Sequence, residues 1–143
     1  MSEPALSERL ARLGKELGER EAEHRAAIAE AWRQAQTLRG EVAAALEAFT
    51  AAAAQAGAPQ LVVAVGETRT DAKHLRAVEF DLTRGRHRAI VTVKSRGDVT
   101  LVGPFHVGKT EGPCKSFPYA AQHELHGALG DFLEKFLAEA ATP

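Results

Sequence analysis

The stretch Val78–Phe105, VEFDLTRGRHRAIVTVKSRGDVTLVGPF, decides the fold. Apolar, often β-branched residues alternate with polar ones in three short runs, and turns centred on Gly85 and Gly97 separate these runs. This pattern is typical of a three-stranded antiparallel meander with one buried face and one partly solvated face. Residues 61–65, Leu-Val-Val-Ala-Val, add a short strand before a polar loop at 66–76. We therefore predict a small antiparallel sheet of about four strands.

A second apolar pattern follows Pro118. Its residues recur at the three- and four-residue spacing of a helix, and the acidic side chains lie off the stripe. The stripe predicts a C-terminal amphipathic helix that packs on the buried face of the sheet. A helix bound to a membrane surface would carry Lys or Arg on its polar face, whereas this one is acidic. The stripe consists of Leu125, Leu129, Phe132, Leu133, Phe136, Leu137 and Ala140.

The N-terminal region predicts a long helical segment, because no proline occurs between Pro4 and Pro59 and apolar residues recur at helical spacing. Gly57 is a plausible C-cap, and Pro59 prevents the helix from continuing. We expect a helical arm at 1–57 and a compact domain at 58–143, in an α+β arrangement. The seam of the arm consists of Leu6, Leu10, Leu13 and Leu17, followed by Ile28, Ala31, Ala35, Leu38, Val42, Ala45, Phe49 and Ala52.

The length of this helical region leaves two alternatives open. An uninterrupted helix of about 50 residues would be about 75 Å long, which is more than one small sheet covers. The helix either breaks near Gly18 or Gly40 and folds into a hairpin, or pairs with a second copy as a coiled coil. We favour self-association, so we expect a homo-oligomer or a protein partner bound through the N-terminal helix.

Composition sets limits on the compartment and on partners. The net charge is -1, but residues 66–116 are basic, with 10 Lys or Arg against 6 Asp or Glu, while both flanking regions are acidic. A single cysteine, Cys114, excludes an intrachain disulfide. The N-terminus has no signal-peptide layout, and no apolar run has the length of a membrane span. We therefore expect a cytoplasmic protein with no membrane association.

The sequence from Gly103 to Thr110, GPFHVGKT, fits the phosphate-loop pattern. In such loops a helix begins within the motif, and its N-terminus supplies part of the anion site together with the Lys and Thr. Here Gly112 and Pro113 oppose a continuing helix, and the preceding strands predict an antiparallel sheet. An enzyme that uses this loop on a phosphorylated ligand is therefore the third hypothesis, after the two given below.

A basic hairpin is the other candidate binding feature. Arg84, Arg86 and Arg88 surround the first turn of the meander, and guanidinium groups form paired hydrogen bonds with phosphates and carboxylates. No aromatic residue is interleaved with them, so stacking on bases is not supported. The full set of anion-binding candidates is Arg84, Arg86, Arg88, Lys109, Thr110 and Lys115.

The remaining motifs predict no catalytic site, metal or cofactor. The tripeptide Arg96-Gly97-Asp98 fits a tight turn. His123 and His126 are three residues apart, whereas the zinc-protease pattern needs four, and no fourth ligand is evident beside Cys114. We therefore expect a non-enzymatic interaction module that self-associates through its N-terminal helix. The second hypothesis is an anion- or nucleic-acid-binding module that uses the basic hairpin and the loop at 103–115.

Overall fold

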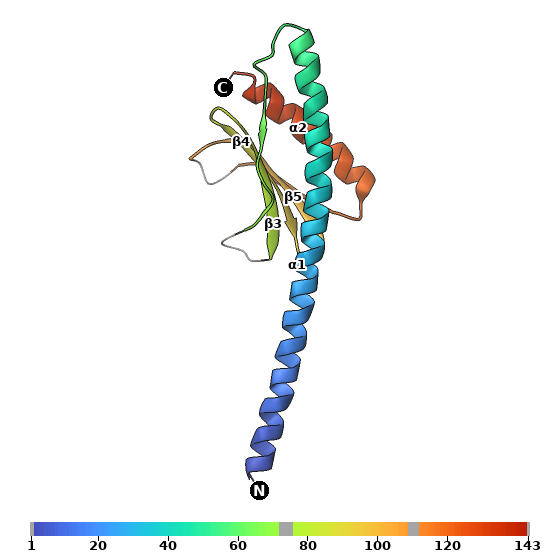
Figure 1. Ribbon diagram of the computed structural model, residues 1–143, viewed down its shortest axis with the longest axis vertical. Helices are drawn as coiled ribbons and strands as arrows, with labels where there is room; N and C mark the ends of the chain where they lie inside the picture. Colours follow the sequence, from blue (N-terminus) through green and yellow to red (C-terminus); the bar gives the residue numbers. More distant parts are fainter. Residues whose placement is uncertain (1, 72–75, 109–111, 143) are drawn as a thin grey trace.

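The computed structural model describes residues 2–71, 76–108 and 112–142, and it has the predicted α+β class (Figure 1). A long N-terminal helix precedes an antiparallel sheet, and a shorter helix follows it. The elements are α1 (Ser2–Gln55), β1 (Ala64–Val65), β2 (Arg69–Thr70), β3 (Ala77–Arg84), β4 (His87–Lys94), β5 (Asp98–His106), β6 (Cys114–Pro118) and α2 (Gln122–Ala140).

The predicted meander is confirmed as β3, β4 and β5, which form the centre of the sheet. The order of strands is β1-β3-β4-β5-β6, β2 also pairs with β3, and every pairing is antiparallel. Gly85 and Gly97 occupy the two turns with φ of 58° and 99°, a conformation that glycine adopts without strain. The tripeptide that contains Gly97 is thus part of a tight turn, as predicted.

The sheet edges differ from the prediction. The strand expected at 61–65 is reduced to β1, because the Leu61 and Val62 amides donate to the Ala58 and Gln60 carbonyls instead of to a neighbouring strand. β2 lies within the stretch predicted as a polar loop, and β6 adds an edge strand after the Gly103 motif. Both strands are short and contain charged residues, so their sequences lack the alternation that identifies a strand.

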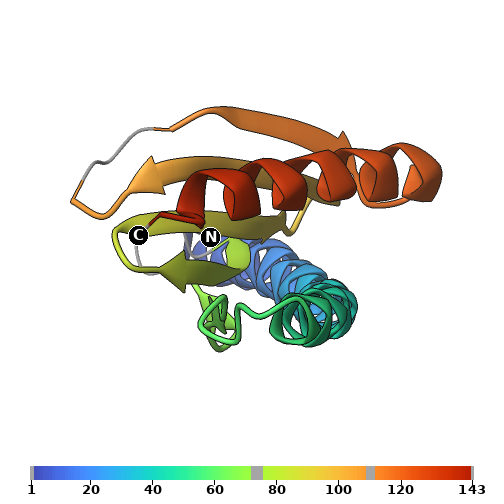
Figure 2. The same cartoon turned by 90° about the horizontal axis from the view of Figure 1, so that it is seen from above.

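Both helices pack on the same face of the sheet. Val78, Phe80 and Leu82 of β3 point to this face and are fully buried, together with their cross-strand neighbours on β4 and β5. Helix α1 contacts β3 and β4, whereas α2 contacts β4, β5 and β6 (Figure 2). The predicted C-terminal helix on the sheet is confirmed. The residues that it buries are Leu125, Leu129, Phe132, Phe136 and Ala140, with Leu133 and Leu137 partly buried against them.

Helix α1 is continuous over 54 residues, so the hairpin alternative is wrong. Gly18 and Gly40 lie inside the helix, where each reduces helix stability by about 1 kcal/mol relative to alanine. The surrounding helix-forming residues and the packing of the second half on the sheet stabilise the helix by more than this. The predicted end at Gly57 is confirmed. This residue has a φ of 98°, and the Ala58 amide donates to the Ala53 carbonyl at 2.8 Å in the bonding pattern of a Schellman motif.

The two halves of α1 have different surroundings. In the second half the sequence predicted that Ala45 belongs to the seam, but Ala45 is exposed and Leu46 is buried instead. Leu46 follows the buried Val42 by four residues, about one helical turn, and so lies on the same face. The first half extends past the sheet (Figure 1). The described side chains from Ala5 to Glu23 are all exposed. The residues of α1 that join the core are Ala31, Ala35, Leu38, Val42 and Leu46.

The burial of the meander can be tested with a matched pair of substitutions. We expect Leu82→Ala to reduce the free energy of unfolding by about 2–5 kcal/mol, because it leaves a cavity at a fully buried position. Val62→Ala should change it by less than about 0.5 kcal/mol, since Val62 is 54% exposed. Urea unfolding followed by circular dichroism measures both values. Equal effects would contradict the described core.

Candidate functional site

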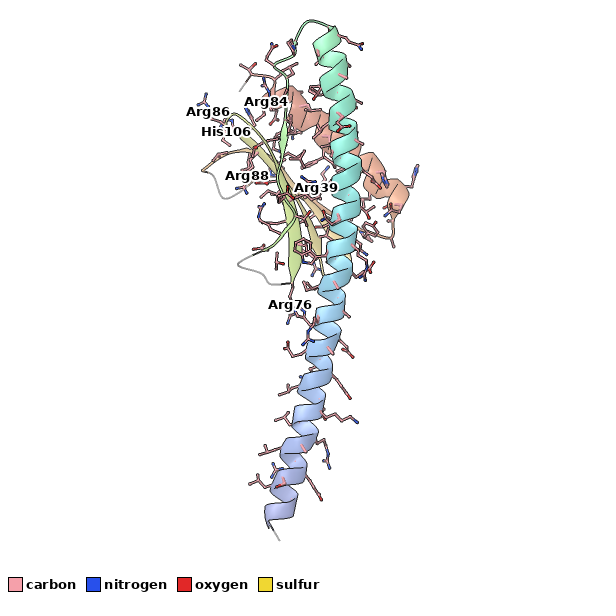
Figure 3. The ribbon with its side chains drawn as sticks, in the orientation of Figure 1. Arg39, Arg76, Arg84, Arg86, Arg88 and His106 are labelled. Carbon is pink, nitrogen blue, oxygen red and sulfur yellow. The ribbon has the colours of Figure 1, made fainter. Side chains whose placement is uncertain are left out.

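The three hairpin arginines have different environments, although they lie near one another in sequence (Figure 3). The Arg84 guanidinium donates to the Ala140 carbonyl, to the Ala141 carbonyl at 3.3 Å and to the Gln60 carbonyl at 3.3 Å. These carbonyls include the last ones of α2, which have no partner within the helix. Arg84 therefore fixes the end of α2 to the sheet and to the segment after α1.

Arg88 belongs to a charge network on the sheet face opposite the helices. Its guanidinium contacts the Asp81 carboxylate at 2.9 and 3.1 Å. Arg69 of β2 contacts the same carboxylate at 3.3 Å and the Glu79 carboxylate at 3.0 Å. The network joins β2, β3 and β4 and balances two arginines with two carboxylates. The network itself therefore carries no excess positive charge.

Arg86 lies at the exposed end of the same hairpin (Figure 3). Within the described residues its guanidinium forms no hydrogen bond or ion pair, while its backbone carbonyl accepts from the Val107 amide at 2.7 Å. Next to it, the rings of His87 and His106 meet edge to face with centroids 4.9 Å apart. Arg86 is thus the hairpin arginine whose side chain remains available to an external anion.

The phosphate-loop resemblance begins inside a strand. Residues Gly103–His106 belong to β5, so the described part of the motif contains no helix N-terminus that could bind phosphate. Gly103 has a φ of 108°, and an added Cβ would lie 3.0 Å from the Arg88 carbonyl oxygen. The close approach of β4 and β5 therefore explains this glycine. Lys109 and Thr110 lie outside the described residues.

Lys115 lies on β6 and lines a cleft between the sheet and α2, on the opposite side of β5 from the charge network. The cleft has a volume of about 380 Å³ and an apolar floor that includes Leu101, Phe117 and Phe132. Lys115, Asp131 and Lys135 also line it. The structure therefore does not group Lys115 with Arg84 or Arg88, and the candidate anion ligands form no common site among the described residues. An anion-binding role for the individual residues stays a prediction.

The histidines of α2 are not arranged around a metal. Across the described ranges 2–71, 76–108 and 112–142, no three His, Cys, Asp or Glu side chains form a group that could hold one. Instead, the two ring nitrogens of His126 contact the Gln122 carbonyl and the Glu41 carboxylate, each at 2.7 Å. The bond to Gln122, and then that to Glu41, raise the pKa of His126 above its ordinary value. This contact links α2 to α1.

The first part of the predicted seam of the helical arm is exposed. Leu6, Leu10, Leu13 and Leu17 are 56%, 60%, 47% and 47% exposed, and they follow one another at steps of three and four residues along the first half of α1. Such an exposed apolar row is typical of an association surface. We name these four residues the leucine stripe.

Comparisons with known proteins add no assignment, since no family model, curated protein or solved structure gives a significant match to this chain. Of the helices in the part of the chain that the structure describes, none combines the length and the apolar content that crossing a membrane requires.

The roles of the hairpin arginines can be separated by alanine substitution. Arg84→Ala and Arg88→Ala each remove charged hydrogen bonds, and we expect each to reduce the free energy of unfolding by about 1–2 kcal/mol. Arg86→Ala should change it by less than about 0.5 kcal/mol, because its side chain bonds to nothing in the described chain. Urea unfolding of the three variants measures the difference. A loss for Arg86→Ala as large as the others would contradict this assignment.

The His126 contact predicts a pH-dependent contribution to stability. Because the folded-state pKa is raised, the stabilisation is complete below the unfolded-state value of about 6.5 and is lost as the pH rises through the folded value. The difference in urea midpoint between the wild type and His126→Gln should therefore be larger near pH 5.5 than near pH 8. A difference that stays constant, or that grows with pH, would contradict the contact.

Proposed function

We propose that this protein is an interaction module that self-associates through the first half of α1. The observation that carries the proposal is the leucine stripe, which stays about half exposed on a helix that extends past its own domain. When another helix covers a helical face of this kind, its apolar side chains are removed from water, which favours association.

Two further observations favour a helical partner for this surface. The side chains between the leucines are small or charged, and Gly14 lies on the flank of the stripe, where it allows close approach of a second helix. The apolar face of α2 already packs on the sheet, so it cannot bind a second helix. The stripe is therefore the described surface best suited to association between helices.

An anion-binding function ranks second. The observation in its favour is the exposed Arg86 side chain, which bonds to none of the residues that the structure describes and lies beside the His87 and His106 pair. A broad surface for binding polyanions is not favoured, because Arg84 and Arg88 already bind carbonyl and carboxylate groups of the fold. One available guanidinium supports a local contact better than it supports a nucleic-acid groove.

Self-association can be tested by sedimentation velocity from about 1 to about 300 µM. The monomer has a mass of 15.3 kDa, and we expect the weight-average mass of the wild type to rise from this value with concentration. Leu13→Glu should keep the protein monomeric, because it places a carboxylate in the middle of the stripe. Ala22→Glu introduces the same charge on the opposite side of the exposed helix and should associate like the wild type.

The far-ultraviolet circular dichroism of all three proteins should be alike, because neither substitution touches the core. A wild type that stays at the monomer mass over the whole range would overturn the proposed function, as would a Leu13→Glu variant that associates normally.

A further inference from the structure

The leucine stripe lies on the same face of α1 that packs on the sheet farther along the helix. Ala31 follows Leu13 by 18 residues, and Ala35 follows Leu17 by the same interval, which is about five complete turns. Ala31 is 1% exposed and Ala35 is fully buried, whereas the two leucines are 47% exposed. The stripe therefore continues the core-facing side of α1 beyond the end of the sheet.

This continuity restricts how a second helix can cover the stripe. A partner helix that ran in the same direction would reach Ala31, where the sheet of the first copy already occupies the face. The partner's sheet would likewise cover this face of the partner's helix and would collide with the helix of the first copy. A partner that ran in the opposite direction would leave both sheets untouched.

We propose, building on the proposed function, that a second copy of this chain binds the stripe in antiparallel orientation. In the register that places every leucine opposite another leucine, Leu6 faces the partner's Leu17 and Leu10 faces the partner's Leu13. The partner helix begins at Ser2 and therefore starts opposite residue 21. Residue 21 is still exposed, and His24, three residues or about 5 Å farther along, is the first described residue of α1 that is partly buried. The overlap therefore ends before the part of α1 that the sheet covers.

The charges beside the stripe agree with this orientation. Arg9 and Glu16 each precede a leucine of the stripe and lie on the same flank. In the antiparallel register Arg9 lies beside the partner's Glu16, and the two-fold symmetry produces this attractive pair twice. In a parallel, in-register pair Glu16 would lie beside the partner's Glu21, which is a like-charge contact. Exposed pairs of this kind select an orientation more than they add strength.

The orientation can be tested by charge exchange, with dissociation constants from sedimentation equilibrium. Arg9→Glu alone, and Glu16→Arg alone, should each weaken the dimer about 3- to 10-fold, because both symmetric pairs then carry like charges. The double variant Arg9→Glu/Glu16→Arg should restore wild-type affinity. A parallel dimer would instead tighten with Glu16→Arg, which removes its like-charge contact, and that outcome would overturn the antiparallel arrangement.

A distance measurement gives an independent answer. In a Cys114→Ser background, a spin label on Ala29→Cys lies outside the region of overlap, at an exposed position. Electron–electron resonance should give about 50 Å between labels, because the antiparallel register places these positions 35 residues apart along the helix axis. A distance under about 25 Å in a proven dimer would overturn the orientation and leave the proposed function standing. A wild type that stays monomeric would overturn both.

Discussion

The fold depends on covering one apolar face of a small sheet. β3, β4 and β5 present this face through alternating side chains, and no single helix described here is positioned to cover all of it. Helix α1 covers the β3 side with Leu38, Val42 and Leu46 and with the small residues Ala31 and Ala35, which allow its backbone to come close to the strands. Helix α2 covers the β5 side with Phe132 and Phe136. The second half of α1 is thus an integral part of the core, and only its first half is available for another purpose.

Charge in this protein serves mainly to connect elements of the fold. Arg84 joins β3 to the end of α2, and the Arg69 and Arg88 side chains join three strands through Asp81. Arg39 of α1 donates to the Gly66 carbonyl at 2.8 Å and so connects the long helix to the end of β1. Part of the basic stretch in the sequence therefore becomes a set of internal contacts, because Arg69, Arg84 and Arg88 each reach a carbonyl or carboxylate that only the tertiary fold brings to them.

The sequence predicts those elements whose signal is local. Alternation with glycine turns identifies β3 to β5, helical spacing identifies α2, and Gly57 with Pro59 marks the end of α1. The sequence does not predict what depends on distant partners. β1, β2 and β6 exist because longer strands offer them backbone groups, and the Arg84 contact spans 56 residues. For the candidate site, the leucine stripe was visible as a seam, but its alignment with the core-facing side of α1 required the structure. The structure was also needed to show that the Arg86 side chain is exposed while those of Arg84 and Arg88 bind other parts of the fold.

The continuity of α1 also bears on how its exposed half stays helical. Starting a helix in water is unfavourable, because several residues must be ordered before the first hydrogen bond forms, whereas extending an existing helix is much easier. The half that the sheet holds in place provides that nucleus, so the exposed half forms by extension alone, even with Gly14 and Gly18 in it. Fraying then proceeds inward from the exposed start of α1, and we expect Leu17 to keep its helical conformation better than Leu6. The helical order of the first half of α1 therefore depends on the folded domain. Destabilising the domain would also unfold the leucine stripe.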